Sequence, residues 1–192
     1  GLADELAELL SLSISNVRLR EKLSAEAIRD PLTQLYNRRY MEETFQKKIL
    51  LAARNQLPIG VIMLDIDHFK QFNDQHGHAA GDAVLVMLAG FLEAHLRGSD
   101  FACRYGGEEF VLILYDCSAE NSSARASQLA ADLRLKSAVF GGQDLGAITL
   151  SMGVAAYPQH GDQPEELLRA ADAALYRAKQ NGRDRIELAV QA

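Results

Sequence analysis

The order of helices and strands predicted for this chain of 192 residues indicates one mixed α/β domain, with helices on a partly antiparallel sheet. The apolar run Ile59–Leu64 has the length and composition of a buried strand. Phe101–Tyr105 and Phe110–Tyr115 are predicted as two strands joined across Gly106-Gly107, a dipeptide that suits the positive φ angles of a tight hairpin turn. Amphipathic helical segments separate these strands.

A predicted helix, residues 1–29, precedes this domain. It has no proline and no glycine after Gly1, and it ends at Asp30 because the residue before Pro31 is displaced from the helical region. The apolar seam of a coiled coil is present at its start and is then replaced by polar residues: Leu2, Leu6 and Leu9, followed by Ser13, Asn16 and Arg20. The pattern is compatible with a solvated helix and with a parallel dimer stalk. We expect the domain itself to occupy residues 30–192.

Within the domain the predicted order is helix, strand, helix, hairpin, helix, strand, helix. The segment 81–95 is predicted as an amphipathic helix, because its apolar residues gather on one side. The helix that begins at Pro164 starts on a residue that favours the first helical position. This helix is predicted to end at residue 180. The remaining elements are predicted as helices at 37–55 and 120–136 and as strands at 147–157 and 186–190.

The composition excludes several classes of protein. Twenty Lys and Arg against 26 Asp and Glu give a formal charge of −6, which argues against sequence-independent binding to DNA or RNA. No apolar run reaches the ~20 residues of a membrane span, and the first residues do not follow the plan of a signal peptide. The cysteines, Cys103 and Cys117, are too few for a disulfide framework or a zinc cluster, so we expect a reduced, cytoplasmic protein. The hairpin pairing places Cys103 opposite Phe110, away from Cys117, and predicts that they form no disulfide.

A carboxylate directly follows the buried strand, in the segment Asp65-Ile-Asp-His-Phe-Lys70. An isolated charge beside a core is costly, so we expect a cation to pair with Asp65. We expect Asp67 to cap the short turn that follows. Lys70, taken alone, is compatible with an ordinary surface lysine.

A second acidic segment, Gly106-Gly-Glu-Glu-Phe110, lies on the hairpin. Its glycines permit a ligand to approach the backbone closely, and Glu108 follows them at the tip. Adjacent glutamates of a strand point to opposite faces, so Glu109 does not share the role of Glu108. If the strand that ends at Asp65 lies beside this hairpin, Asp65 and Glu108 converge. Two such carboxylates suit Mg²⁺, which binds together with substrate phosphates, and they indicate metal-assisted phosphoryl transfer of the two-metal type.

The segment between the two acidic clusters offers groups for recognition of a base. Asn73 and Asp82 supply an amide and a carboxylate, and the carboxylate can accept hydrogen bonds from the N1–H and the 2-amino group of guanine. His76 and His78 with Asp74 could indicate zinc, but no matching ligand set follows downstream. Helix capping or polar packing is the favoured interpretation of these three residues.

These segments together resemble the GGDEF domain of diguanylate cyclases. The resemblance covers about residues 29–187, with Glu108 in place of the aspartate that names the family. It implies a palm-like, ferredoxin-like mixed sheet flanked by helices and related to nucleotidyl cyclases. The segments that carry it are Asp30-Pro-Leu-Thr-Gln-Leu-Tyr-Asn-Arg-Arg39, Asp65-Ile-Asp-His-Phe-Lys-Gln-Phe-Asn-Asp74, His76-Gly-His-Ala-Ala-Gly-Asp82, Arg104-Tyr-Gly-Gly-Glu-Glu-Phe110 and Ala174-Leu-Tyr-Arg-Ala-Lys-Gln-Asn-Gly-Arg183.

The resemblance implies condensation of two GTP molecules into cyclic di-GMP with release of pyrophosphate. Asp65, the Ile66 carbonyl and Glu108 would bind Mg²⁺, or Mn²⁺ in its place. Glu108 would also act as the base toward the ribose 3′-OH, and Lys70 would offset charge on the phosphates. The residues implied to bind the nucleotide are Asn73 and Asp82 at guanine, His78 and Gly107 along the pocket, and Lys179 and Arg183 at the β- and γ-phosphates. Without this context, Lys179 and Arg183 would be interpreted as solvated charges at a helix end.

The reaction implied by the resemblance joins two nucleotides, so two domains must face each other and a homodimer is expected. In the family an upstream sensory domain usually drives this approach, and this sequence, which starts without Met, is expected to lack it. Arg97 and Asp100 match the spacing of the family's product-inhibition site, where an arginine fork can grip guanine and phosphate. The alternative to an enzyme is a GGDEF module that binds GTP or cyclic di-GMP without turnover. The intact set of Asp65, Lys70, Asn73, Asp82 and Glu108 favours the enzyme.

Overall fold

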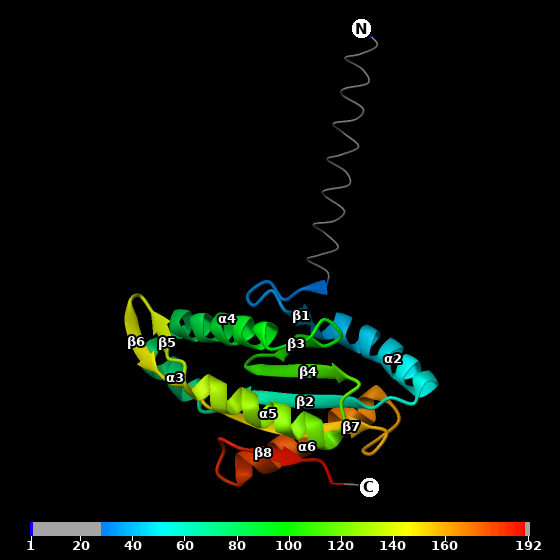
Figure 1. Ribbon diagram of the computed structural model, residues 1–192. Coiled ribbons are helices and arrows are strands. Elements are labelled where there is room, and N and C mark those ends of the chain that lie inside the picture. Colours follow the sequence, from blue (N-terminus) through cyan, green and yellow to red (C-terminus); the bar gives the residue numbers. More distant parts are fainter. Residues whose placement is uncertain (2–27, 191–192) are drawn as a thin grey trace.

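Six strands form one mixed sheet in the order β1-β3-β4-β2-β7-β8, and helices cover both of its faces (Figure 1). The computed structural model describes Gly1 and residues 28–190. The strands are β1 (Tyr36–Asn37), β2 (Ile59–Ile66), β3 (Phe101–Gly106), β4 (Glu109–Tyr115), β7 (Leu150–Tyr157) and β8 (Ile186–Leu188). The helices are α2 (Arg38–Asn55), α3 (Phe69–His76), α4 (His78–Ala94), α5 (Ala119–Arg134) and α6 (Pro164–Gln180). This architecture confirms the mixed α/β fold predicted from the sequence.

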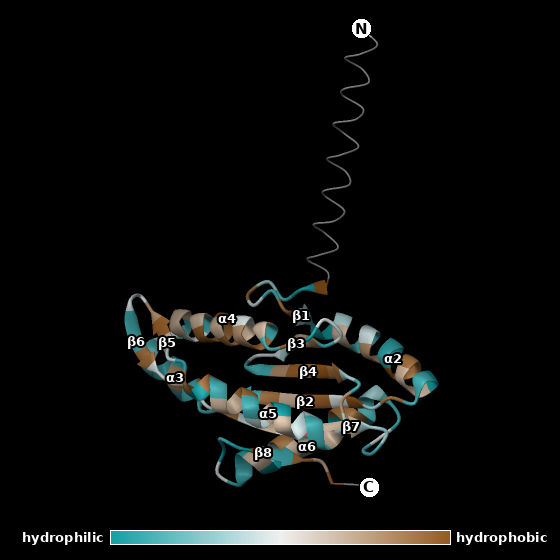
Figure 2. Ribbon diagram, viewed as in Figure 1, coloured by the Kyte–Doolittle hydropathy of each residue, from teal (hydrophilic) through white to brown (hydrophobic). Residues whose placement is uncertain are grey.

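The central strand β2 divides the hydrophobic core into two halves. It pairs antiparallel with β4 on one side and β7 on the other, and every residue of it is buried. Alternate side chains of a strand point to opposite faces, so Leu64 packs in the core under α4 and α5, whereas Met63 packs under α2 and α6. Figure 2 shows strands β2 and β4 mostly in brown, the colour of hydrophobic residues, whereas α2 and α5 mix brown with white and teal.

Helix α6 lies unusually close to β7. A side chain at Gly153 would collide with the backbone of the helix at Ala171 and Leu175, so only glycine fits at this position of β7. Ala171 and Ala174, both buried, keep the facing side of the helix thin. This close contact fixes the last turn of α6 above the carboxyl end of β2, where the predicted site lies.

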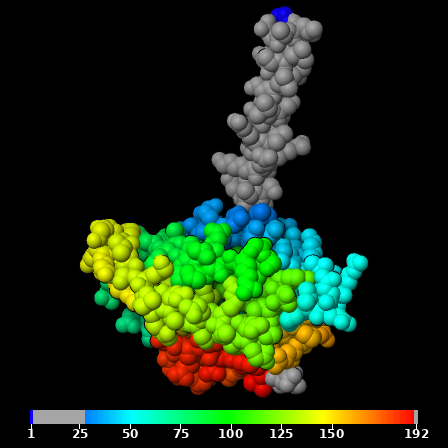
Figure 3. Space-filling view, in the orientation of Figure 1, coloured from blue at the N-terminus to red at the C-terminus, as the bar shows by residue number. Residues whose placement is uncertain are grey.

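Four elements of the structure, β1, α3, β5 (Ala138–Phe140) and β6 (Gln143–Gly146), were not predicted. Strand β1 contains only two residues, which is too short to show a pattern. Helix α3 lies inside the segment interpreted as ligand-binding, and α4 begins at His78 rather than at Gly81. A separate hairpin, formed by β5 and β6, turns at Gly141-Gly142, where both φ angles are positive. Figure 3 shows this hairpin, in yellow, projecting at one end of the molecule.

The register of the β3–β4 hairpin differs by one residue from the expected pairing. A bulge between Arg104 and Gly106 places Cys103 opposite Val111, so the expected pairing of Cys103 with Phe110 is wrong. Bulges of this kind add one residue to a strand and cannot be located from alternation alone. Cys103 and Cys117 form no disulfide, as expected, and both are buried. Burial raises the pKa of the Cys103 thiol to about 12.

The predicted leader helix falls almost wholly on residues 2–27, which lie outside the described residues, so its coiled-coil seam stays a prediction. At the start of the described domain, Arg29 forms a bridge with Tyr36 and lies over its ring at 4.2 Å. Among residues 28–190, no helix combines the length and the apolar character that crossing a membrane requires.

Candidate active site

Two neighbouring strands bring the predicted carboxylates to one end of the sheet. Strands β2 and β4 pair with Asp65 opposite Glu109, so Glu108, in the turn that precedes β4, lies beside the carboxyl end of β2. Gly107 occupies this turn with φ 52°, a conformation that glycine adopts at little cost. The arrangement agrees with the expected convergence of Asp65 and Glu108.

Asp65 is buried and paired with a cation, as its position after an apolar strand predicted. Its Oδ2 lies 2.8 Å from Nζ of Lys179 on α6, and its side chain is only 9% exposed. Burial raises the pKa of Asp65, the hydrogen bond and charge of Lys179 lower it, and the nearby charges of Glu108 and Glu109 raise it further, with a net increase. The carboxylate therefore lies in a cluster where negative charge exceeds positive charge, and such a cluster favours binding of a further cation.

The donor atoms at this end of the sheet fit a magnesium ion better than a zinc ion. Within residues 28–190, no group of three or more His, Cys, Asp or Glu is arranged to hold a metal, and His76, His78 and Asp74 form no such group. Mg²⁺ does not need one, because it is usually bound by one or two carboxylates together with water and substrate phosphates. The oxygen donors of Asp65 and Glu108 and the carbonyl of Ile66 are of the kind that Mg²⁺ or Mn²⁺ prefers.

An ion pair anchors the β3–β4 hairpin to the first turn of the domain. Arg104 donates to both carboxylate oxygens of Asp30, at 3.2 and 3.3 Å, and to the carbonyl of Gly107, at 2.9 and 3.0 Å. Asp30 also accepts hydrogen bonds from the N–H and the hydroxyl of Thr33. Partial burial raises the pKa of Asp30, but the hydrogen bonds from Thr33 and the charge of Arg104 outweigh it and leave the pKa below its ordinary value. The turn before Glu108 is thus braced from outside the hairpin.

The expected guanine-reading residues lie where α3 meets α4. Asn73 of α3 packs against Gly81 of α4, where a side chain would collide with its amide oxygen, and Asp82 follows next to it. The Oδ1 atom of Asn73 is buried and has no hydrogen-bond partner in the described part of the chain, an arrangement that is uncommon in folded proteins. Lys70 and His78 are exposed on α3 and at the start of α4.

The carboxyl end of α6 carries the expected phosphate-binding residues. Lys179 is half-buried against Asp65, whereas Arg183 is exposed in the turn that follows the helix. Asp67 was expected to cap the next short turn, but the residue before α3 is His68, which makes no side-chain cap. The carboxylate of Asp67 instead accepts hydrogen bonds from Thr149, Ser151 and the N–H of Asp184. The capping prediction for Asp67 is therefore wrong.

Arg97 and Asp100 lie between α4 and β3, away from Asp65, Glu108 and Glu109, which together form the acidic cluster. The side chain of Asp100 is 1% exposed and forms an ion pair with Arg125 at 2.9 Å, and it also accepts from the N–H of Tyr115. Arg97 is exposed and lines a cavity of about 210 Å³ together with Arg29. Asp100 thus has a structural role in holding this loop, while the guanidinium of Arg97 remains accessible.

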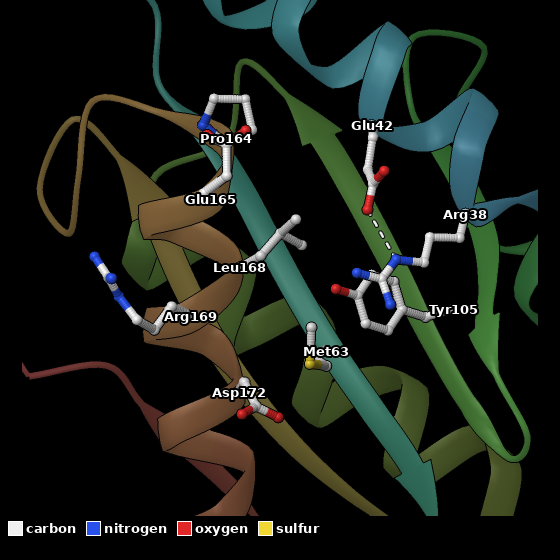
Figure 4. A pocket seen from close by; sticks show the side chains of 9 residues that line it. All are labelled: Arg38, Glu42, Met63, Tyr105, Pro164, Glu165, Leu168, Arg169 and Asp172. Atoms are coloured by element: carbon white, nitrogen blue, oxygen red, sulfur yellow. Dashed lines mark hydrogen bonds and ion pairs between the residues drawn. The ribbon is translucent and has the colours of Figure 1, made fainter.

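The face between α2 and α6 is hollowed close to the acidic cluster. The larger cavity, about 540 Å³, has Met63 among its lining residues, and Arg38 at one wall pairs with Glu42 and lies over the ring of Tyr105 (Figure 4). Asp172 lines both this cavity and a second one, about 410 Å³, that also contains Lys179 and Glu109. No residue predicted for the site lines the larger cavity, so it is separate from the predicted nucleotide contacts.

Comparison with known proteins identifies the family to which this chain is similar. The sequence model of the family described as "Diguanylate cyclase, GGDEF domain" matches residues 27–185. The chain is 42% identical over 164 residues to diguanylate cyclase DgcP of Pseudomonas aeruginosa, covering 85% of this chain and 24% of that protein. It is 38% identical over 162 residues to diguanylate cyclase DosC of Escherichia coli, covering 83% of this chain and 34% of that protein. The chain thus spans about a quarter to a third of the length of these curated relatives.

Solved structures show the same fold. The coiled coil and GGDEF domain of DgcB from Caulobacter crescentus, solved in complex with cyclic di-GMP, is 33% identical with a TM-score of 0.83 and covers 95% of this chain and 98% of that one. The active GGEEF domain of a diguanylate cyclase from Vibrio cholerae is 33% identical with a TM-score of 0.75, covering 83% of this chain and 100% of that one. On this agreement of sequence and fold, the chain belongs to the GGDEF family of diguanylate cyclases.

Proposed function

We propose that residues 30–192 form a catalytic domain that condenses two GTP molecules into cyclic di-GMP and two pyrophosphates. Membership of the GGDEF family and relatives named diguanylate cyclases support this activity. The observation that carries it is the position of Asp65, buried beside Glu108 and Glu109 and facing Lys179. A site built this way suits a triphosphate, because it offers carboxylates for a divalent cation and an ammonium for the phosphates.

The reaction needs the 3′ oxygen of one GTP to bond to the α-phosphorus of the other as pyrophosphate leaves. In this proposal Glu108 accepts the proton that the 3′-OH releases, and Lys70 offsets negative charge on the phosphates. A bound Mg²⁺ or Mn²⁺, held by Asp65, Glu108 and the Ile66 carbonyl, would supply Lewis-acid polarisation of the phosphate oxygens. The same bond formation on the second pair of atoms closes the ring.

Binding of the nucleotide falls to residues at both ends of the site. Asn73 and Asp82 would hydrogen-bond guanine, and the unpartnered Oδ1 of Asn73 provides a buried acceptor for an N–H donor of the base. The sequence-derived roles of His78 and Gly107 are contacts along the nucleotide. Lys179 and Arg183 would hold the β- and γ-phosphates, with Lys179 exchanging Asp65 for the substrate.

A homodimer follows from the chemistry of the reaction. One domain provides one set of carboxylates and one guanine site, whereas the product contains two guanosines, so two domains must bring their nucleotides together. Residues 1–29 are proposed to pair as the element that sets this approach. The similarity of this chain to a solved coiled coil with its GGDEF domain supports this role.

Feedback by the product is proposed at the loop between α4 and β3. Arg97 is accessible beside a cavity and carries the planar donors that suit a guanine base or a phosphate. Solved relatives contain bound cyclic di-GMP, which is consistent with affinity of this fold for the product. Asp100, which is held by Arg125, would contribute mainly by shaping the loop.

Incubation of the purified chain with GTP and Mg²⁺, followed by chromatography for cyclic di-GMP, tests the proposed function. We expect product formation, with a rate per mole of protein that rises with protein concentration because two domains must meet. The variant Glu108→Gln keeps the size of the side chain but removes the proposed base and metal ligand, so we expect a loss of about 100-fold or more in turnover.

The matched control is Glu43→Gln, an exposed glutamate of α2 that pairs only with the exposed Arg39 among the described residues. It should retain normal turnover. If the wild-type chain binds GTP but forms no cyclic di-GMP at any concentration, the binding module replaces the enzyme as the better account. Normal turnover by Glu108→Gln would contradict the proposed mechanism.

A further inference from the structure

The turn between α6 and β8 has a strained backbone. Gly182, Arg183 and Asp184 follow one another with φ angles of 111°, 62° and 46°. Residues other than glycine adopt such angles at a cost, and they keep them only where the surrounding structure holds them. Since Arg183 is the proposed phosphate-binding residue, the contacts that hold this turn also decide where its guanidinium can reach.

Asp67 makes the longest-range of these contacts in the described chain. Its Oδ2 accepts hydrogen bonds from the N–H of Asp184 at 3.0 Å and from the hydroxyl of Thr149 at 2.7 Å, and its Oδ1 accepts from the hydroxyl of Ser151 at 2.6 Å. The residue is buried, and its own N–H donates to the carbonyl of Thr149 at 3.0 Å. The carboxylate is therefore rigid and joins the end of β2, the start of β7 and the turn after α6.

The remaining contacts of the turn hold its backbone and leave the Arg183 side chain available. The N–H of Arg183 donates to the carbonyl of Ala178 at 3.0 Å, and its carbonyl accepts from Nε of Arg185 at 3.2 Å. Arg134 of α5 pairs with Asp184 at 2.6 Å. Both partners of that ion pair are more than 40% exposed, so it contributes little. The structure gives the side chain of Arg183 no hydrogen bond or ion pair among residues 28–190, and the residue is exposed.

We propose that Asp67 is a positioning residue for the phosphate-binding end of the site. By accepting from the N–H of Asp184, its carboxylate locks the turn in the conformation that presents Arg183 alongside Lys179. This inference rests on the proposed function, because it takes Lys179 and Arg183 as the contacts of the β- and γ-phosphates. Asp65, near the end of β2, and Asp67, just beyond it, thus have different roles: the first would hold a metal ion and the second holds the turn.

Binding measurements separate this role from a general structural one. The probes are α,β-methylene-GTP, which has all three phosphates but cannot release pyrophosphate, and GMP, which lacks the β- and γ-phosphates. The variant Asp67→Ala should weaken binding of the GTP analogue by about tenfold, the value expected for loss of a hydrogen bond to a charged group. It should change the affinity for GMP by less than about twofold, because GMP does not reach Arg183.

The conservative variant Asp67→Asn provides a rescue. One amide oxygen can still accept from Thr149 and from the N–H of Asp184, while the amide nitrogen donates to the hydroxyl of Ser151. We expect it to recover most of the lost affinity for the analogue. The matched control Thr149→Val removes one hydrogen bond to the same carboxylate without touching the turn, and it should bind the analogue as the wild type does.

A double-mutant cycle with Arg183→Ala completes the test, with folding of each variant checked by thermal unfolding. Removal of Asp67 should have no further effect once Arg183 is absent, because both changes abolish the same contact. The positioning role would be overturned if Asp67→Ala weakened binding of GMP and of the analogue equally. It would also be overturned if the effect of Asp67→Ala on affinity added fully to that of Arg183→Ala. If Asp67→Ala does not fold, the same cycle with Asp67→Ser, whose shorter side chain does not reach the N–H of Asp184, decides between the two roles. Failure of the wild-type chain to bind the analogue at all would overturn the proposed function, and this inference with it.

Discussion

At the scale of single residues, the site is best described by its buried polar side chains and their partners. Asp65 and Asp67 differ by two positions and are both buried, yet their partners are different in kind: an ammonium for one, two hydroxyls and a backbone N–H for the other. An apolar strand that runs into a carboxylate indicates a cation partner for Asp65, and the structure confirms one. For Asp67 the sequence offers no such signal, because Asp184 is 117 residues away along the chain.

Whether the surroundings of a site residue could be predicted depends on how far along the chain its partners lie. Asn73 and Asp82 are near neighbours in sequence and lie on two consecutive helices, where Asn73 packs against Gly81, the residue before Asp82. Arg104 appears in a recognisable motif, but its partner Asp30 is 74 residues away and was interpreted only as the residue that ends the leader helix. Local chemistry is visible in a sequence, whereas an ion pair between distant segments depends on a register that only the folded sheet supplies.

His160 gives a prediction on pH at this scale. It is buried, and its Nδ1 accepts a hydrogen bond from the N–H of Ala156 at 3.0 Å. Burial lowers the pKa of His160 below its ordinary value of 6.5, although backbone hydrogen bonds oppose the shift. The unfolded chain therefore takes up a proton below about pH 6.5 that the folded protein refuses, so the free energy of unfolding should fall as the pH drops from 6.5 toward the pKa of the folded state.

The measurement is the free energy of unfolding in urea between pH 5 and 7.5. His160→Gln should be less stable than the wild type at pH 7.5, and the difference between the two proteins should shrink as the pH falls. His68→Gln, a change at an exposed histidine, is the control and should follow the wild-type profile. A constant difference between wild type and His160→Gln across this range would contradict the prediction.

At the scale of elements, long amphipathic segments were predicted well and short ones were missed. The helix predicted at 164–180 has the observed bounds, whereas α3 has eight residues and few apolar positions. Contacts stabilise α3: Phe69 and Phe72 stack on each other, and Asn73 packs on Gly81. The β5–β6 hairpin did carry a usable signal, because Gly141-Gly142 is a dipeptide of the kind that forms two-residue hairpin turns.

The brace between the first turn and the β3–β4 hairpin gives a prediction at this scale. Asp30→Ala removes the partner of Arg104 and the acceptor of both Thr33 hydrogen bonds, so we expect a loss of about 1–3 kcal/mol in the free energy of unfolding. Turnover of GTP should also fall severalfold at temperatures where the variant stays folded, because the turn that carries Glu108 is less well positioned.

The control for this prediction is Glu43→Ala, which breaks an ion pair whose side chains are 85% and 61% exposed. Such pairs contribute little, so its stability should change by less than about 0.5 kcal/mol and its turnover not at all. Urea denaturation and initial rates measure the two effects separately. A folded Asp30→Ala protein with wild-type turnover would show that the brace serves stability alone.

At the scale of the whole molecule, two regions with different proposed tasks lie apart on one domain. The acidic cluster lies at the carboxyl end of β2, whereas Arg97 lies in the loop that follows α4, beside the edge of the sheet formed by β1 and β3. The mixed α/β fold followed from the sequence, and both regions were predicted from motifs of adjacent residues, so their roles stay predictions. The register of the hairpin did not follow from the sequence, since a single bulge moved it.

Product inhibition gives a prediction for the molecule as a whole. Arg97→Ala removes an exposed guanidinium far from the acidic cluster, so initial turnover of GTP should stay normal while added cyclic di-GMP should inhibit at least about tenfold less strongly. Initial rates at increasing product concentration measure this. Asp100→Ala is a poor substitute, because it would leave Arg125 without its buried partner and would also lower stability. Inhibition that is unchanged in Arg97→Ala would remove the regulatory role from this loop.

The carboxylates of the proposed site and its phosphate-binding residues lie far apart along the chain, and this separation has a consequence for biosynthesis. A ribosome delivers the acidic residues of β2 and β4 first, and Lys179 and the 182–184 turn only after α5, β7 and most of α6. Until then Asp65 has no ammonium to offset its burial, and the end of β2 cannot settle into its final environment. A nascent chain that still lacks α6 and the turn after it therefore cannot complete the site proposed for GTP.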